Sequence, residues 1–196
     1  MSKEKTKDLL IEAGSKTFLE KGYTNAGIES ILQATGVPKG SFYYYFDSKE
    51  SFALEVLRRF AACYDEARDR TLGDAKVSPL VRLRRYFEGA VDRIESDQCR
   101  KGCLVGKLSQ EMADQSEVFR AQLEEIFESW VDRYGECLQS AQAAGEIDPD
   151  LDVHELAEFW LNSWQGALLR AKTMRSTAPL RTFLDLMFGH LLKPRG

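Results

Sequence analysis

The sequence of 196 residues lacks several features that would assign it to common functional classes. No stretch approaches the roughly 18 consecutive apolar residues that are needed to span a bilayer, so we expect no membrane partner. The sequence contains no glycine-rich phosphate-binding loop. It begins with charged residues rather than with the apolar core of a signal peptide. We therefore expect a cytoplasmic protein.

Cysteine and histidine are also scarce, with four cysteines and two histidines. In a cytoplasmic protein, the cysteines are expected to be reduced thiols and not a disulfide framework. Cys99 and Cys103 form a C-x₃-C pair, but neither His154 nor His190 lies near them in sequence. A zinc site needs four ligands in compatible positions. We therefore predict no metal and no cofactor.

The net charge of −4 argues only weakly against a nucleic-acid partner, because the charge is unevenly distributed. Residues 1–50 contain seven lysines and seven acidic residues, whereas the remainder contains 20 basic and 24 acidic residues. The first segment is therefore neutral, and the excess of acid lies in the second. Local placement of basic residues matters more for nucleic-acid binding than the sum.

Apolar residues recur with helical spacing along most of the chain, and neither a convincing strand nor an internal repeat is present. The fold class that we predict is all-α, with about nine helices. Capping residues and prolines mark the expected starts of several helices. The expected helices run from Lys5 to Lys21 (ending at Gly22), from Ser48 to Leu72, from Pro79, from Cys103, from Ser116 to near Gly145, from Asp152 to Met174, and from Pro179.

The most informative stretch is VPKGSFYYYF, residues 37–46. Pro38 has a fixed φ and no amide hydrogen, so it suits the first position of a helix. Phe42, Tyr45 and Phe46 follow at positions i, i+3 and i+4, and this spacing predicts that they face a core. The stretch therefore predicts a short helix with one buried face.

The other residues of this short helix point outward. Lys39, Ser41, Tyr43 and Tyr44 suit the DNA major groove, where lysine and serine reach base edges or phosphates and tyrosine hydroxyls reach phosphates. Gly40 removes a side chain where the backbone has to approach the duplex closely. We therefore predict a recognition helix.

A second short helix precedes this one, and a glycine-containing turn joins the two. Such a pair within about twenty residues is a helix-turn-helix. The spaced residues that carry a resemblance are Gly22, Tyr23, Ile31, Gly36, Val37, Lys39, Gly40, Phe42, Tyr43, Phe46, Ser48, Lys49 and Glu50. They resemble the signature of the TetR family of one-component repressors. The alternative is a helical hairpin of an unrelated α-protein.

The resemblance implies an N-terminal three-helix DNA-binding domain, residues 1–47, and a C-terminal helical ligand-binding and dimerisation domain, residues 48–196. Where the family usually has Thr or Ser at the start of the second helix, this chain has Ala26-Gly27. We therefore expect Asn25 to cap that helix and Thr24 to contact the DNA backbone. The expected DNA-binding residues are Thr24, Asn25, Pro38, Lys39, Gly40, Ser41, Tyr43, Tyr44, Tyr45 and Lys49.

The last two predicted helices are apolar on more than one side. The resemblance implies that they pair with their copies in a four-helix dimer interface, and a two-fold dimer also matches two half-sites of a palindromic operator. A monomer with a wide core is the alternative. The expected interface residues are Trp160, Phe183, Met187 and Phe188.

The resemblance further implies a pocket for a small-molecule effector in the larger domain. An aromatic stripe at helical spacing is as consistent with plain core as with a pocket. The candidate lining residues are Met112, Phe127, Trp130, Tyr134 and Trp164.

Cys103 is a candidate sensor, because Arg100, Lys101 and a helix start all favour its thiolate form. The segment GCLVGKLS, residues 102–109, together with Lys172 resembles the NemR-type branch, whose members sense reactive electrophiles through such a cysteine. An AcuR-like branch responds to acrylate-type compounds. Our hypothesis is that Cys103 is alkylated or oxidised, with Lys172 as its charge partner and Lys107 in the same sensor segment. The alternative is a buried thiol that acts as a small hydrophobe.

We predict a one-component transcriptional regulator, a repressor, that binds palindromic operator DNA as a homodimer and is released by a small molecule or a reactive electrophile. We expect no enzymatic activity. One alternative is a thiol-dependent enzyme, although no motif places a histidine near Cys103. The other is a helical interaction module that does not bind DNA.

Overall fold

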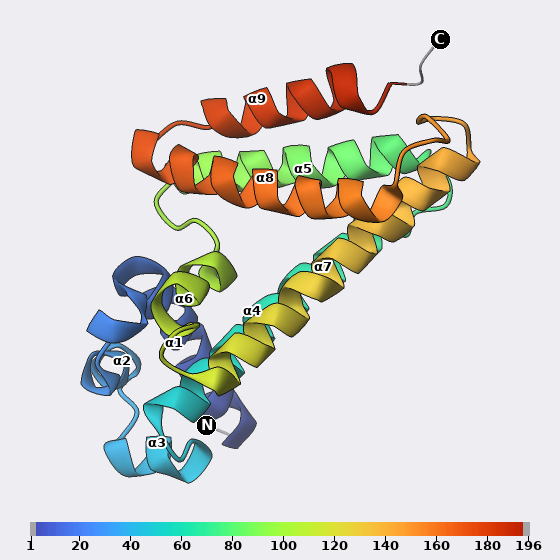
Figure 1. Cartoon of the computed structure of the whole chain (residues 1–196). Helices are drawn as coiled ribbons and strands as arrows, with labels where there is room; N and C mark the ends of the chain where they lie inside the picture. The colour runs from blue at the N-terminus through green and yellow to red at the C-terminus, as the bar shows by residue number, and fades with distance from the viewer. Residues whose placement is uncertain (1–2, 194–196) are drawn as a thin grey trace. The chain divides into compact units, whose positions relative to one another are not determined.

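The computed structural model describes residues 3–193, so Met1, Ser2 and residues 194–196 lie outside the described range. Within that range the chain forms α-helices, followed by a π-helical turn at Met187–Leu191, and contains no strand (Figure 1). The all-α prediction is confirmed. No helix of the described part is long and apolar enough to cross a membrane. The helices are α1 (Lys3–Asn25), α2 (Ile28–Thr35), α3 (Lys39–Tyr45), α4 (Lys49–Leu72), α5 (Pro79–Ser96), α6 (Leu104–Met112), α7 (Glu117–Ala143), α8 (Val153–Met174) and α9 (Ala178–Leu186).

Three helices begin at the capping residues that the sequence predicted. Before α4, Ser48 Oγ accepts a hydrogen bond from the Ser51 amide at 3.0 Å, and the Ser51 hydroxyl accepts one from the Ser48 amide at 3.1 Å. Before α7, Ser116 Oγ accepts from the Phe119 amide at 3.3 Å. Asp152 accepts two amide hydrogens at the start of α8. Each such cap stabilises its helix by about 1 kcal/mol.

The end of α1 differs in part from the expectation. Gly22 leaves the helical conformation as predicted, with φ 81° and ψ 172°, although the helix assignment continues to Asn25. The predicted capping of α2 by Asn25 is wrong, because the N-cap is Gly27 and has no side-chain hydrogen bond. Asn25 belongs to the last turn of α1 and donates from Nδ2 to the Lys21 carbonyl oxygen at 3.4 Å.

The chain packs into two compact units, and the boundaries between them fall inside α4, just before α6, and inside α7. The first unit contains the residues up to Tyr64 together with Cys103–Glu124, and the second contains Asp65–Gly102 and the residues from Glu125 onward. This partition follows packing, whereas the predicted domains 1–47 and 48–196 were defined by function. The functional division stays a prediction.

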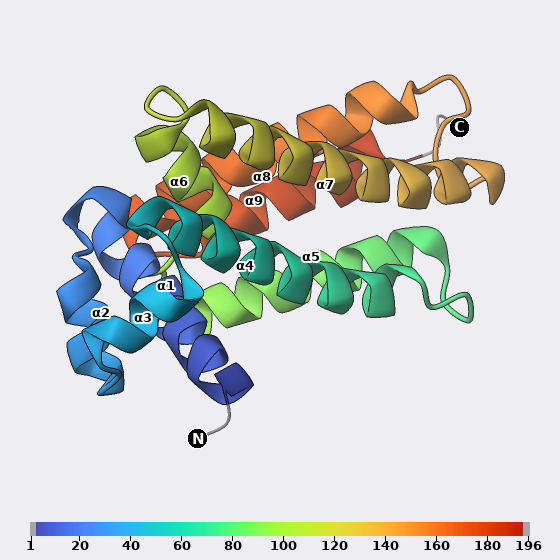
Figure 2. The same ribbon diagram turned by 90° about the horizontal axis from the view of Figure 1, so that it is seen from below.

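A cluster of phenylalanines forms the core of the first unit, where α1, α2, α3 and the start of α4 gather (Figure 2). The Phe52 ring lies 5.9 Å from Phe18, 5.1 Å from Phe42 and 4.8 Å from Phe46, measured between ring centroids. A Cβ at Gly14 would lie 2.4 Å from Phe52 Cζ, so only glycine lets α1 approach α4 this closely. The core therefore fixes α3 from its inner side.

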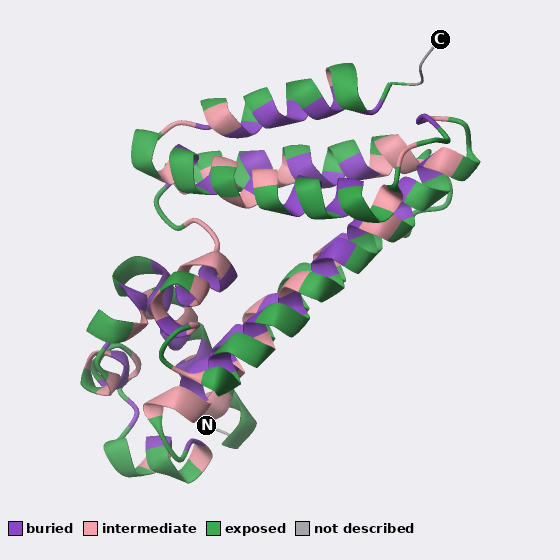
Figure 3. Ribbon diagram, viewed as in Figure 1, coloured by how far each residue is buried: buried purple, intermediate pink, exposed green. Residues whose placement is uncertain are grey.

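The second unit has its own aromatic core. Phe87 of α5 lies 5.3 Å from Tyr134 of α7, and 5.0 and 4.8 Å from Trp160 and Trp164 of α8. Phe183 of α9 adds a ring 5.2 Å from Trp160. Figure 3 shows the buried sides of α5, α8 and α9 turned toward one another, while the outer side of α9 is exposed.

Candidate functional site

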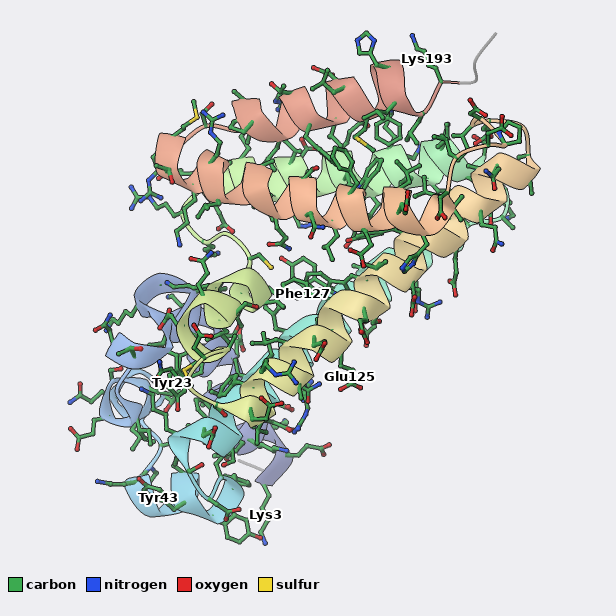
Figure 4. All side chains as sticks on the ribbon, viewed as in Figure 1. Lys3, Tyr23, Tyr43, Glu125, Phe127 and Lys193 are labelled. Carbon is green, nitrogen blue, oxygen red and sulfur yellow. The ribbon has the colours of Figure 1, made fainter. Side chains whose placement is uncertain are left out.

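The outward side of α3 carries the predicted recognition residues. Phe42 is fully buried, whereas Tyr43 and Tyr44 expose 48% and 64% of their surface. Lys39 is also exposed at the first position of the helix. Figure 4 shows Tyr43 on the outer side of α3. The helix therefore presents one cation and two phenol groups to solvent from a fixed backbone.

The other predicted DNA-binding residues differ in exposure. Pro38 is exposed and extended, with φ −61° and ψ 145°, so it is the N-cap of α3 rather than its first helical residue. Ser41 and Tyr45 are partly buried, and the Tyr45 ring packs 5.0 Å from that of Tyr44. Three more are exposed: Thr24, Asn25 and Gly40.

Lys3 belongs with these residues, although it was not among the predicted site residues. Its Nζ donates a hydrogen bond to Tyr44 Oη at 2.9 Å and lies 4.9 Å from the centre of that ring. The hydrogen bond to Tyr44 raises the pKa of Lys3. Since 41 residues separate the two side chains, no local sequence pattern indicated this contact.

Lys49, which we expected to contact DNA, is partly buried and has an acceptor for its ammonium group within the protein. Its Nζ donates to the Tyr23 carbonyl oxygen at 2.6 Å and lies 4.3 Å from the centre of the Tyr23 ring. Burial lowers the pKa of Lys49. The side chain ties the start of α4 to the end of α1, because unpaired carbonyl groups there need donors.

Two side chains of α6 hold the same end of α1. Lys107 Nζ donates to the Leu19 and Glu20 carbonyl oxygens at 3.0 and 3.5 Å. One turn later, a Glu111 oxygen accepts the Thr24 amide hydrogen at 3.0 Å. Lys107, which we predicted as a sensor residue, therefore contacts α1 instead. The Thr24 amide, having an internal acceptor, does not need a phosphate.

Cys103 is the N-cap residue of α6 and is partly buried. Lys172 of α8 donates from Nζ to the Lys101 carbonyl oxygen at 3.4 Å, and its Cδ lies 3.5 Å from where a Cβ on Gly102 would be. Lys172 therefore lies against the two residues that immediately precede Cys103 in sequence. Cys103 belongs to the first unit and Lys172 to the second, so their pairing stays a prediction.

Four of the five candidate residues for lining an effector pocket lie in the second unit. Trp130, Tyr134 and Trp164 are buried, and the partly buried Phe127 ring lies 5.7 Å from that of Trp130. Met112 is buried as well, but in the first unit. The structure therefore separates Met112 from the other four candidate lining residues.

One charged residue in this core had no signal in the sequence. Arg68 of α4 is only 1% exposed, and its guanidinium carbon lies 5.9 Å from the ring centres of both Trp130 and Tyr134. It pairs with Asp65, one turn earlier. Within the charged sequence YDEARDR, no pattern distinguishes Arg68 from its exposed neighbours.

Two pockets lie elsewhere in the second unit. One, of about 300 Å³, is lined by Asp69, Leu72, Gly73, Arg82, Arg133, Glu136, Cys137 and Ser140. The other, of about 450 Å³, is lined by Glu95, Gln98, Cys99, Arg100, Arg175, Ser176 and Thr177. Neither lining contains a predicted effector residue. Across residues 3–193 there is no group of three or more side chains that could hold a metal ion.

The predicted dimer-interface residues require a correction. Trp160, Phe183, Met187 and Phe188 are all buried within the second unit. The Trp160 ring alone contacts two of the others, with centroids 5.2 Å from Phe183 and 5.4 Å from Phe188. Because these side chains are already covered by their own chain, they are not available to a partner. The exposed apolar side chains of α8, α9 and the following turn include Phe159, Leu169, Leu186 and Leu191.

Family models match both parts of the chain. Residues 10–56 match a model described as bacterial regulatory proteins of the tetR family, and residues 79–187 match the tetracyclin repressor-like C-terminal domain. The chain belongs to the TetR family of transcriptional regulators.

Individual TetR-family proteins are similar over nearly the whole length. The transcriptional repressor DhaR of Mycobacterium sp. (strain GP1) is 40% identical over 98% of this chain and 95% of its own. The regulator AcuR of Cereibacter sphaeroides is 41% identical over 93% of this chain and 84% of its own. The structure of reduced E. coli NemR superposes with a TM-score of 0.90 at 27% identity, covering 98% of this chain and 99% of that one.

These relatives confirm the resemblance to the NemR and AcuR branch of the TetR family. Relatives and family models alike describe transcriptional regulators. The family consists of regulators rather than enzymes, which argues against the thiol-dependent enzyme.

Proposed function

We propose that this TetR-family protein is a one-component repressor that binds a palindromic operator as a homodimer and leaves it when an effector binds. The supporting observation is the two-sided character of α3. Its inner side is fixed by Phe42, whereas Lys39, Tyr43 and Tyr44 are exposed. Basic and phenolic side chains on a short, rigid helix suit contacts with phosphates and base edges in the major groove. A cytoplasmic location accords with this function and stays a prediction.

The outer side of α8 and α9 supports the homodimer. Phe159 and Leu169 on α8 and Leu186 on α9 are exposed large apolar side chains. Gly166 of α8 and Gly189 of the π-helical turn after α9 have no atoms within 4 Å of a potential Cβ, so a partner helix can approach them closely. A two-fold dimer would then place two recognition helices about 34–36 Å apart, one turn of B-DNA.

We further propose that Cys103 is the sensor for a reactive electrophile and that Lys172 is its charge partner. Cys103 lies at the start of α6, where backbone amides favour a thiolate. NemR is a relative with a structure described as the reduced form. The alternative is that the effector binds without covalent chemistry and that Cys103 is a packing residue. Substitution of Cys103 by serine distinguishes the two mechanisms.

The route from α6 to DNA is carried by the bonds of Lys107 and Glu111 to the end of α1. An adduct at Cys103 that shifts α6 would pull on α1, which contacts α2 in the helix-turn-helix. If the two recognition helices then no longer fit successive grooves, the affinity for DNA falls. By linkage, DNA-bound protein must bind the effector more weakly by the same factor.

The test is fluorescence anisotropy with duplexes from the DNA that flanks the gene. We expect specific binding with a Kd of about 10⁻⁸ M or tighter, and affinity that falls steeply with salt. Pre-treatment with an electrophile should release the duplex, and Cys103→Ser should abolish release without changing operator affinity. Failure to bind any flanking duplex at low salt would refute the repressor, and an unchanged release in Cys103→Ser would refute the sensor.

A further inference from the structure

Backbone strain is concentrated at one place in the second unit. In the part of the chain that the structure describes, the residues other than glycine with a positive φ are Gln98 and Cys99, both at 54°, and Arg175, at 52°. Gln98 and Cys99 lie in the turn after α5, and Arg175 is the C-cap residue of α8. All three line the same pocket of about 450 Å³. Because a side chain makes this conformation unfavourable, such residues often mark binding sites.

A hydrogen bond joins the two turns that form this pocket, which follow α5 and α8 in Figure 1. Arg175 Nη1 donates to the Cys99 carbonyl oxygen at 3.3 Å, across 76 residues of sequence. A guanidinium has five N–H donors, and this bond uses one of them. The neighbouring Ser176 hydroxyl accepts the Ala178 amide hydrogen at 3.2 Å and makes no further hydrogen bond within residues 3–193. The pocket is therefore rich in hydrogen-bond donors.

Two arginines of the lining have no acidic partner. The ion pairs within the described residues include neither Arg100 nor Arg175. The acidic residue of the lining, Glu95, pairs instead with Arg181, whose Nη2 lies 2.9 Å from Glu95 Oε2. Since Glu95 and Arg181 neutralise each other, the two positive charges of Arg100 and Arg175 remain in the lining. The pocket therefore lacks a matching negative charge.

We propose that this pocket binds a phosphate dianion, either inorganic phosphate or the phosphate group of a monoester. The two guanidinium groups supply two positive charges, and their planar pairs of N–H groups match phosphate oxygens. Gln98 and Ser176 add neutral donors from the same lining. A carboxylate would balance only one of the two cations, so it should bind more weakly.

The phosphate site is distinct from the predicted effector pocket, because its lining contains none of the candidate effector residues. It lies at the ends of α5 and α8 rather than in the aromatic core. It requires neither DNA binding nor a reactive Cys103. The site therefore goes beyond the proposed function, and each can fail without the other.

Arg175 is the residue that separates ligand binding from a purely structural role. A C-cap residue with a positive φ is usually glycine, which adopts this conformation without strain. An arginine there lowers stability, and contact with a ligand compensates for that loss. The alternative is that Arg175 only holds the Cys99 carbonyl oxygen and stabilises the C-terminal end of α8. The two roles predict opposite effects of Arg175→Gly on stability.

The experiment is a titration of the full-length, isotope-labelled protein, followed by amide NMR at constant ionic strength and about pH 8, where phosphate is mainly the dianion. The probes are inorganic phosphate, glycerol 3-phosphate and acetate. We expect the amides of Gln98, Arg100 and Ser176 to shift with phosphate at a Kd of about 1 mM or below. Acetate should bind at least about tenfold more weakly, because hydrogen bonds to a second charged group are lost. A response to only one of the two phosphates would identify the source of the ligand.

Two variants test the arginines. Arg100→Gln should weaken phosphate binding at least about tenfold, because a hydrogen bond to a charged group is lost. Arg175→Gly should weaken it equally, while the melting temperature stays the same or rises because the strain is relieved. Arg170→Gln is the matched control, since Arg170 is an exposed arginine of α8 outside the lining. It removes the same charge and should keep close to the wild-type affinity.

Four results would overturn the inference: no shift of these amides at about 20 mM phosphate, well above a millimolar Kd; shifts confined to α3, which would indicate an ion on the DNA-binding surface; equal affinity for phosphate and acetate; or wild-type phosphate affinity in either variant. If Arg175→Gly fails to fold by circular dichroism, Arg100→Gln decides. A lower melting temperature in a folded Arg175→Gly would contradict the role of strain, and the affinities alone would then decide.

Discussion

Adjacent residues of α3 differ sharply in burial. Substitution of a buried residue therefore changes the stability of the fold, whereas substitution of an exposed residue can change DNA binding alone. Phe42 is fully buried and packs on Phe52, whereas the next two residues are largely exposed. Replacement of Phe42 would therefore alter folding, and loss of DNA binding in that variant would say nothing about contacts. Exposed positions are the ones that separate recognition from stability.

Lys39→Gln is the first such test. Lys39 is exposed, and its side chain has no hydrogen bond to any residue between 3 and 193, the part that the structure describes, so we expect an unchanged melting temperature. Loss of one phosphate or base contact should weaken operator binding by about 1–3 kcal/mol. If the contact is to a phosphate, the slope of log K against log salt also falls by about 1.

The control for Lys39→Gln is Lys16→Gln. Lys16 is an exposed lysine of α1 outside the predicted contact set, and its loss changes the net charge equally. Operator affinity in this control should fall only by the small long-range contribution of one charge. Equal losses in the two variants would mean that α3 has no special role in binding.

The four cysteines should differ sharply in reactivity. Burial raises the pKa of the Cys137 thiol to about 11 and also raises the pKa of Cys99. At pH 7.5 a thiol with a pKa near 11 is ionised to less than about one part in a thousand, and only the thiolate reacts. We expect N-ethylmaleimide to label the exposed Cys63 and the α6 N-cap residue Cys103, and to spare Cys99 and Cys137.

Peptide mass spectrometry of the folded protein after brief labelling would measure this order. Unfolding in guanidinium should make all four thiols reactive, because burial is what protects Cys99 and Cys137 from the reagent in the folded protein. Labelling of Cys99 or Cys137 at the rate of Cys63 in the folded protein would contradict the structure. An unlabelled Cys103 would contradict the sensor proposal only.

At the scale of single helices, α6 is the element whose contacts suggest a transmitting role. Its first residue follows Cys103, and Lys107 and Glu111 hold the last turn of α1. Gly22 suits this position because its φ of 81° is one that other residues rarely adopt, and its lack of a side chain leaves room for the Glu111 carboxylate. The sensor segment and α1 of the helix-turn-helix domain are therefore joined by hydrogen bonds as well as by packing of α6 on α1.

Lys107→Met should weaken the coupling between the sensor segment at Cys103 and the helix-turn-helix. The variant keeps the apolar stem but loses the hydrogen bonds to the Leu19 and Glu20 carbonyl oxygens. We expect operator affinity close to the wild-type value and a coupling between electrophile and DNA that is reduced by about 0.5–2 kcal/mol. Anisotropy with and without electrophile measures both quantities, and the exposed α6 residue Gln110, changed to Ala, is the control. Full release in Lys107→Met would exclude this route.

The helix starts were predictable from the sequence because capping is local. Ser48, Ser116 and Asp152 need only amides two or three residues away, and the structure has each bond. The capping prediction for Asn25 failed because α1 extends past Gly22, and that extension is fixed by the distant Glu111. The contact of Lys49 was not predictable for the same reason, because its acceptor, the Tyr23 carbonyl oxygen, is distant in sequence.

The direction in which a helix faces was less predictable than its ends. Helices α8 and α9 are apolar around much of their circumference, so periodicity alone could not divide inner from outer residues. Trp160 and Phe183 face inward because Phe87 and Trp164 complete the cluster around them. Arg68 was missed for the related reason that an arginine among charged residues gives no sign of burial.

On the scale of the whole molecule, the proposed repressor depends on two copies acting together. A single recognition helix buries too little surface for useful specificity, and two helices on a two-fold axis bind two half-sites at once. The partner must therefore cover the side of α8 and α9 that the chain itself leaves exposed. Phe159 and Leu186, exposed by 50% and 52%, mark that side.

Phe159→Glu and Leu186→Glu together should convert the dimer to a monomer that is still folded. Both side chains are half exposed in the chain alone, so the charges cost little in a monomer but would be buried without partners in a dimer. Sedimentation equilibrium should show the mass of one 22.3 kDa chain, and operator affinity should fall toward the non-specific level, about 10³-fold or more.

Phe183→Ala is the contrasting control, since Phe183 is buried against Trp160 and Trp164 and its loss should destabilise the fold by about 3–5 kcal/mol. A double variant that stays dimeric would place the interface on another surface, and the two-half-site argument would then have to be made from that surface instead.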